Sequence, residues 1–170
     1  SLGSLAMPGY IHKFFPYYHD RLSPETNDQI SWALLISLLG CVLIAVGGWA
    51  FKGLVIRKFG SNSALFVQYY QWLFPFVFGL ILYNVLEAYG WVLQKSVLTT
   101  FLKEVQWRCI ITVLVVLFFF GIIKSFDTFI VLFSFSYFAL FLTLLTYLLV
   151  ARKIHLTFKV SVVTKRFLKK

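Results

Sequence analysis

Residues 128–150 read TFIVLFSFSYFALFLTLLTYLLV, a run of 23 residues without a charged side chain. An α-helix needs about 20 mostly apolar residues to cross the hydrocarbon core of a bilayer. The run is far too long for a strand, and an open sheet cannot span lipid because its edges leave backbone groups without hydrogen-bond partners. The stretch therefore predicts a transmembrane helix.

Three further segments have the same apolar character, and they lie at 29–51, 65–93 and 105–123. The second is longer than a span requires, and Pro75 inside it is expected to kink the helix. Asp28 precedes the first segment and is a suitable helix N-cap. Only residues 124–127 separate the last two segments, which we therefore expect to form a tight antiparallel pair. The predicted fold is an all-α polytopic membrane protein with four transmembrane helices.

The composition excludes an ordinary soluble domain. Hydrophobic residues make up 60% of the 170-residue chain and charged residues only 13%, and the mean hydropathy is +0.84. A soluble domain carries about 25% charged residues. The net charge of +10 does not indicate nucleic-acid binding, because the basic residues lie between the apolar runs rather than on one polar surface.

The basic residues between the spans predict the orientation of the chain. With four crossings, the N-terminal segment, the region between the second and third spans and the C-terminal tail share one side. That side carries twelve lysines and arginines, against four on the other. We therefore expect both ends in the cytoplasm, although Lys52, Arg57 and Lys58 on the outer side oppose this assignment.

The two flanking segments complete the predicted organisation. Residues 1–28 resemble the end of a truncated helix followed by a cytoplasmic loop, and residues 151–170 form a basic cytoplasmic tail or loop. The tail pattern fits either a strand or a helix. We expect both ends of the sequence to be cut from a longer protein.

Glu87 is the most informative polar residue at membrane depth, and Asn84 lies near it in the same segment. Ionisable groups inside a membrane cost free energy unless they are paired or hydrated. Glu87 is either a cavity-lining carboxylate, for proton coupling or substrate contact, or the partner of Lys103 or Arg108 in an ion pair. The sequence favours the ion pair. Glu104 and Arg108, four residues apart, are expected to form a second pair.

Small and hydroxylated residues form stripes on two of the predicted helices. Ser136, Thr143, Thr146 and Tyr147 share one face of the fourth span and line either a hydrophilic lumen or, as we favour, a helix-packing surface. Ser37, Cys41, Ala45 and Gly48 form a packing seam on the first span. No pattern in the sequence is typical of an enzyme, a metal site or a cofactor site.

Two stretches resemble a known family. They are Met7-Pro-Gly-Tyr-Ile-His-Lys-Phe-Phe-Pro-Tyr-Tyr-His-Asp20 and Val85-Leu-Glu-Ala-Tyr-Gly-Trp-Val-Leu-Gln-Lys-Ser-Val-Leu-Thr-Thr-Phe-Leu-Lys-Glu-Val-Gln-Trp-Arg108. They are similar to the end of the second helix and to the link between the fourth and fifth helices of Wzx-type polysaccharide flippases. These flippases belong to the multidrug/oligosaccharidyl-lipid/polysaccharide export superfamily. The chain departs from the family pattern at Lys13, where an arginine is usual, and at Thr99 and Thr100, where a proline is usual.

The resemblance implies that the chain is part of a transporter with twelve to fourteen helices in the bacterial inner membrane. Such a transporter moves an undecaprenyl-linked glycan across the membrane by alternating access. Its partners would be membrane lipid, the glycan and the remaining helices of the transporter. Lys13, Arg21 and Arg108 are then candidates for binding the substrate pyrophosphate, and Glu87 with Asn84 is the candidate for ion coupling. The alternatives are a multidrug exporter of the same superfamily and a small four-helix membrane subunit that scaffolds a partner.

Overall fold

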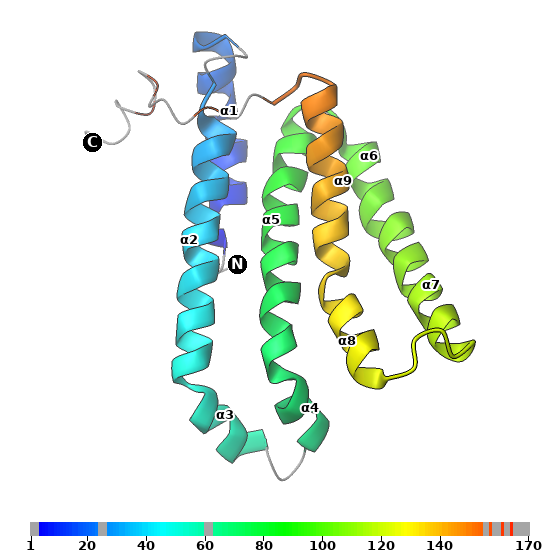
Figure 1. The fold of residues 1–170 in the computed structure, drawn as a ribbon. Coiled ribbons are helices and arrows are strands. Elements are labelled where there is room, and N and C mark those ends of the chain that lie inside the picture. Colours follow the sequence, from blue (N-terminus) through cyan, green and yellow to red (C-terminus); the bar gives the residue numbers. More distant parts are fainter. Residues whose placement is uncertain are drawn as a thin grey trace.

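A computed structural model describes residues 4–23, 27–59, 63–154, 157, 161 and 164. Within this part of the chain every regular element is a helix (Figure 1). Three helical stretches are long and apolar enough to cross a membrane, namely Gln29–Ala50, Leu65–Val92 and Phe126–Val150. The chain is therefore all-helical over its described residues and suited to a membrane, as the sequence predicts.

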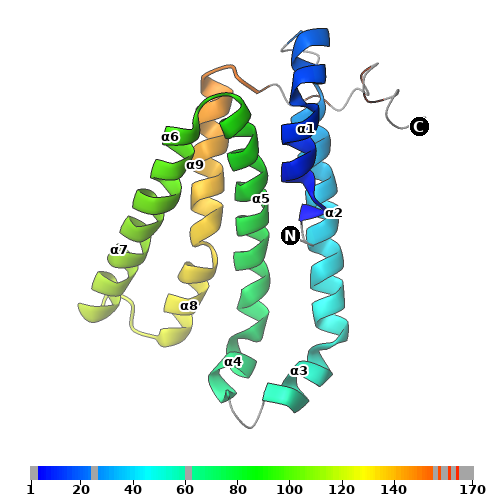
Figure 2. The same cartoon turned by 180° about the vertical axis from the view of Figure 1, so that it is seen from behind.

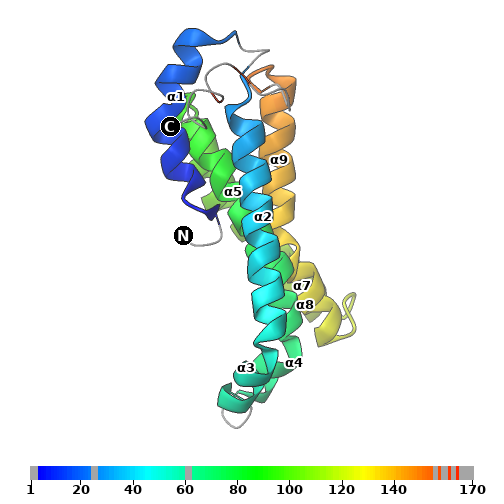
Figure 3. The same cartoon turned by 90° about the vertical axis from the view of Figure 1, so that its left-hand side faces the viewer.

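The central helix of the bundle is α5 (Leu73–Val92). It packs against α1 (Met7–Arg21) and α2 (Gln29–Ala50) on one side and against α9 (Ser136–Val150) on the other. Helix α7 (Trp107–Phe119) lies outside α9 (Figures 1 and 2). Helix α1 covers one end of the α2–α5 pair, as the side view shows (Figure 3). Successive long helices alternate in direction, so the turns gather at the two ends of the bundle.

The second apolar segment is interrupted near its start. It comprises α4 (Ala64–Tyr69), the 3₁₀ turn η2 (Tyr70–Trp72) and α5. Pro75 lies just inside α5, and a proline removes one backbone donor and clashes with the carbonyl four residues earlier, here that of Gln71 in η2. A 3₁₀ turn therefore lies directly before the turn that holds Pro75, and the kink at Pro75 itself stays a prediction.

Two further features differ from the simple segments that the sequence predicts. Residues Lys52–Phe59, expected as loop, form the short exposed helix α3. The last apolar run divides into α8 (Phe126–Ser134) and α9 at Phe135. The Ser134 hydroxyl donates to the Ile130 carbonyl at 2.7 Å, a local bond of a kind that often bends helices.

Helices α5 and α9 approach each other closely at Gly79. A Cβ atom at this position would lie 2.9 Å from the backbone nitrogen of Phe138. Leu140, Leu144 and Leu148, spaced one turn apart on α9, are fully buried in the same core. On α2, Gly48 lies against the Phe74 ring, and its carbonyl accepts a hydrogen bond from the Tyr70 hydroxyl at 3.2 Å. Gly48 of the predicted α2 seam therefore packs against α5, whereas Cys41 and Ala45 of the same seam line a pocket between the two helices.

The third predicted span lies within a longer helical run. Helix α6 (Ser96–Phe101), the π-helical turn η3 (Leu102–Gln106) and α7 follow one another without a loop. Three charged residues, Lys103, Glu104 and Arg108, lie near the middle of this run. This run is not one of the three stretches found long and apolar enough to span a membrane.

Asp28 occupies the N-cap position of α2, as predicted, but its side chain does not cap the helix. Instead, Asn27 Oδ1 accepts from the backbone nitrogen of Gln29 at 3.1 Å. The buried Asp28 carboxylate accepts from Ser161 N at 2.9 Å and from the Thr164 hydroxyl at 2.8 Å.

Most of the predicted tail at 151–170, and residues 24–26 of the predicted N-terminal loop, lie outside the described residues.

Candidate functional site

An ion pair between Glu87 on α5 and Lys103 on η3 lies near one end of the bundle. The Lys103 ammonium donates to both carboxylate oxygens, at 3.2 and 3.1 Å. Glu87 is only 8% exposed, whereas the Lys103 side chain is 39% exposed. The ion-pair interpretation of Glu87 is thus confirmed, with Lys103 as the partner. Arg108 pairs with Glu104 at 2.8 Å, as its spacing predicts.

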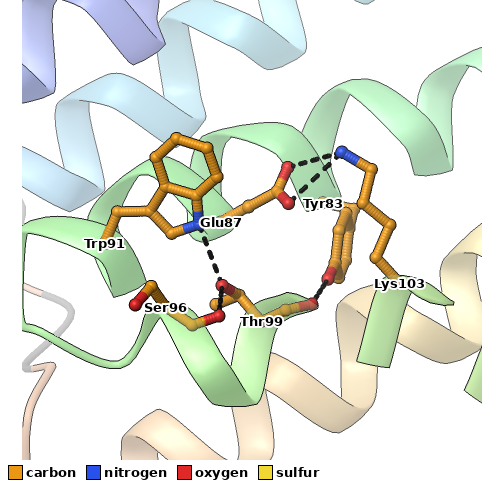
Figure 4. A network of polar contacts seen from close by, with 6 residues as sticks. All are labelled: Tyr83, Glu87, Trp91, Ser96, Thr99 and Lys103. Carbon is orange, nitrogen blue, oxygen red and sulfur yellow. Dashed lines mark hydrogen bonds and ion pairs between the residues drawn. The ribbon is translucent and has the colours of Figure 1, made fainter. Parts of the chain in front are cut away.

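Hydrogen bonds around this pair hold α6 against α5 (Figure 4). The Tyr83 hydroxyl donates to the Thr99 carbonyl at 2.7 Å, and the Trp91 indole donates to the Thr99 hydroxyl at 3.0 Å. That hydroxyl donates in turn to the Ser96 carbonyl at 2.9 Å. These bonds fix the helix that leads into η3, and they therefore fix the position of Lys103 relative to Glu87.

The other side of Glu87 borders a pocket of about 330 Å³ between α1 and α5. Its lining combines polar and aromatic side chains: Pro8, His12, Asn84, Glu87, Ala88 and Trp91. The His12 and Trp91 rings of this lining contact each other at an angle of 53°, with centroids 6.1 Å apart. The pocket therefore offers an amide, an imidazole and a paired carboxylate to one polar ligand.

The structure brings together only some of the candidate residues from the sequence. Asn84 and Glu87 share the α1–α5 pocket. Lys13 is exposed on α1, with its ammonium 5.5 Å from the centroid of the Phe14 ring. Arg21 is exposed at the end of α1, and Arg108 is exposed on α7. None of these three cations lines the α1–α5 pocket.

His12 and Trp91 belong to the pocket but were not among the predicted site residues. Nothing in the sequence pairs them, because they are almost eighty positions apart and meet only through the packing of α1 on α5.

The hydroxyls of Thr143 and Thr146 donate to the Ala139 and Leu142 carbonyls of their own helix. Thr143 also accepts from Gln106 at 2.9 Å, which joins α9 to η3.

Among the described residues there is no group of His, Cys, Asp and Glu side chains suited to a metal ion. Comparisons of the chain with family models, with curated proteins and with solved structures gave no match.

Proposed function

We propose that this chain is part of a transporter that moves a lipid-linked oligosaccharide across the bacterial inner membrane by alternating access. The observation that carries the proposal is the buried Glu87 carboxylate beside a polar pocket in a membrane-type helix bundle. Charged groups at membrane depth are costly, and in transporters they commonly line substrate or ion pathways. The resemblance of Met7–Asp20 and Val85–Arg108 to Wzx-type flippases supports the same class.

The proposal includes a fourth crossing over residues 105–123, which contain the end of η3 and all of α7. This crossing would place both ends of the chain on one side, which the excess of basic residues there assigns to the cytoplasm. The Glu87–Lys103 and Glu104–Arg108 pairs support it, because each offsets charge in the most polar part of the run. Paired charges near the end of a helix reach the membrane interface at lower cost than isolated ones.

Cysteine labelling tests this topology. In a background without Cys41 and Cys109, Lys124→Cys reports on the turn between α7 and α8, and Lys95→Cys on the turn between α5 and α6. We expect a membrane-impermeant maleimide to label Lys124→Cys in intact cells and Lys95→Cys only after permeabilisation. The same result for both variants, with both or neither labelled in intact cells, would contradict the fourth crossing.

Deletion of the gene tests the transport function. We expect undecaprenyl-linked glycan to remain on the cytoplasmic leaflet and surface polysaccharide to be lost. Complementation with Glu87→Gln should restore transport poorly. The matched control is Glu104→Gln, which breaks the exposed Glu104–Arg108 pair and should restore transport. Normal surface polysaccharide with altered drug sensitivity would contradict the proposal and favour a multidrug exporter.

A further inference from the structure

A second pocket, separate from the one beside Glu87, lies where α1, the α1–α2 turn, α5 and the end of α9 meet. Its volume is about 180 Å³. Its polar lining is formed by His19, Asn27, Arg152 and Lys153, and its apolar lining includes Phe15 and Tyr89. Drug-sized ligands occupy pockets of roughly 300–1,000 Å³, so this pocket fits a small group rather than a whole oligosaccharide.

The polar groups of the pocket are mostly available donors. Two ion pairs are found in the described part of the chain, and neither involves Arg152 or Lys153. The Asn27 side-chain oxygen already accepts from Gln29 N, which leaves its amide N–H groups to face a ligand. The Tyr89 side chain is 4% exposed, and none of the hydrogen bonds among the described residues involves its hydroxyl. Such a set of donors suits an anion with several acceptor oxygens.

The backbone at Arg152 supports a constrained cationic site. Its φ of 50° is left-handed, a conformation in which glycine is the usual residue after a helix. The backbone nitrogens of Arg152 and Lys153 bond to the Leu149 and Leu148 carbonyls, both at 3.0 Å. These bonds satisfy the last carbonyls of α9 and hold two adjacent cations at the rim of the pocket.

The pocket also lies at the right depth for a lipid headgroup. The membrane-type stretches end at Val92 and Val150, and the pocket residues Leu93, Arg152 and Lys153 follow directly after these ends. Basic pockets between transmembrane helices at this level bind anionic lipid headgroups. The Phe15 and Tyr89 rings, 5.9 Å apart, supply the apolar wall that the glycerol part of a lipid would contact.

We propose that this pocket binds the phosphate of an anionic phospholipid, with Arg152 and Lys153 as the main cationic contacts. The site is independent of the transport substrate, because it shares no residue with the pocket beside Glu87. The same two cations also complement the negative end of α9, so the test must separate lipid binding from a structural role.

The full chain in mild detergent is titrated with phosphatidylglycerol or phosphatidylcholine, and the bound lipid is counted by native mass spectrometry. We expect retention of phosphatidylglycerol in preference to phosphatidylcholine. Arg152→Gln with Lys153→Gln should weaken phosphatidylglycerol binding about thirtyfold, since each of the two cations contributes about 1 kcal/mol near the surface. The matched control is Arg57→Gln with Lys58→Gln, the same dipeptide at the opposite end of the bundle, which should leave binding unchanged.

Two further variants keep the proposal falsifiable if the glutamine pair unfolds. Arg152→Lys with Lys153→Arg retains both charges and should retain the lipid, and Tyr89→Phe should lower binding severalfold without disturbing the ring contact. Equal losses from the two glutamine pairs, or no loss from either, would overturn the proposal. Displacement of the lipid by an equal concentration of inorganic phosphate would overturn the assignment to a lipid and indicate a soluble phosphate.

Discussion

The Glu87 carboxylate and the Lys103 ammonium meet at 3.1 Å across the contact between α5 and η3, although the residues are 16 positions apart in the sequence. The contact joins the central helix of the bundle to the helical run that carries the proposed fourth crossing. A buried carboxylate on one side and a half-exposed ammonium on the other make the pair sensitive to removal of either partner.

Removing only the cation should destabilise the protein. Lys103→Met leaves the Glu87 carboxylate buried without its partner, and we expect a loss of about 1–3 kcal/mol in the free energy of unfolding. The upper values known for buried pairs do not apply, because Lys103 is 39% exposed. Adding Glu87→Gln should recover most of the loss, as measured by denaturant unfolding in detergent. Strict additivity of the two changes would show that the pair is not energetically coupled.

The α5–α9 contact predicts a second measurable effect. A Cβ at Gly79 would lie 2.9 Å from Phe138 N and 3.1 Å from the Tyr137 carbonyl carbon. Backbone atoms cannot move aside as a side chain can, so Gly79→Ala should cost about 1–3 kcal/mol. Gly47→Ala is the control, because no atom lies within 4 Å of its added Cβ. We expect Gly47→Ala to be neutral or to stabilise by up to about 1 kcal/mol, and a similar loss in both variants would be inconsistent with close packing at Gly79.

Ser125 should stabilise the start of α8. Its side-chain oxygen accepts from Thr128 N at 3.1 Å, which satisfies one of the free donors at a helix N-terminus. Ser125→Ala is expected to cost about 1 kcal/mol of stability, seen as a lower unfolding midpoint. Ser63 precedes α4 but makes no such side-chain bond, so Ser63→Ala should change the midpoint much less. Equal effects would indicate that the capping bond contributes nothing.

Hydropathy predicts the long helices well because burial in lipid demands a continuous apolar run. It does not predict α3, whose eight residues are too polar to register as a span. It also places the start of the third span at residue 105, whereas the helical run begins at Ser96. The helical run accommodates the charged residues between these points because both are paired. Lys103 forms an ion pair with Glu87, and Glu104 forms one with Arg108. Hydropathy identifies the residues that can lie within the membrane, whereas a helix can continue beyond those residues.

The sequence predicts the site only in part for a related reason. Asn84 and Glu87 are three residues apart and therefore share a face of one helix. His12 reaches the same pocket only because α1 packs on α5. In the sequence, Arg152 and Lys153 serve as topology signals in the same way as the other basic residues of the tail. That they border a pocket is seen only in the packing of α1, α5 and the end of α9. Contacts between distant segments need the tertiary structure.

Asp28 should hold the segment that follows α9 against the bundle. Its buried carboxylate accepts from Ser161 N and the Thr164 hydroxyl, and Thr164 is also hydrogen-bonded to the Tyr18 hydroxyl at 2.9 Å. Thr157 N donates to Ser31 on α2 at 3.0 Å, which adds a second attachment. A single carboxylate thus joins residues more than 130 positions apart along the chain.

Asp28→Ala removes the acceptor of both bonds and leaves the Ser161 N–H without its charged partner, so we expect faster tryptic cleavage within residues 152–170. The long helices should remain protected, because each is stabilised by its own packing and backbone bonds. Asp20→Ala removes an exposed carboxylate from α1 and should leave the cleavage rate unchanged. Thr164→Val should reproduce part of the Asp28→Ala effect, since it deletes one of the two donors while keeping the shape of the side chain. Cleavage at the wild-type rate in both Asp28→Ala and Thr164→Val would show that the segment is held by contacts other than this carboxylate.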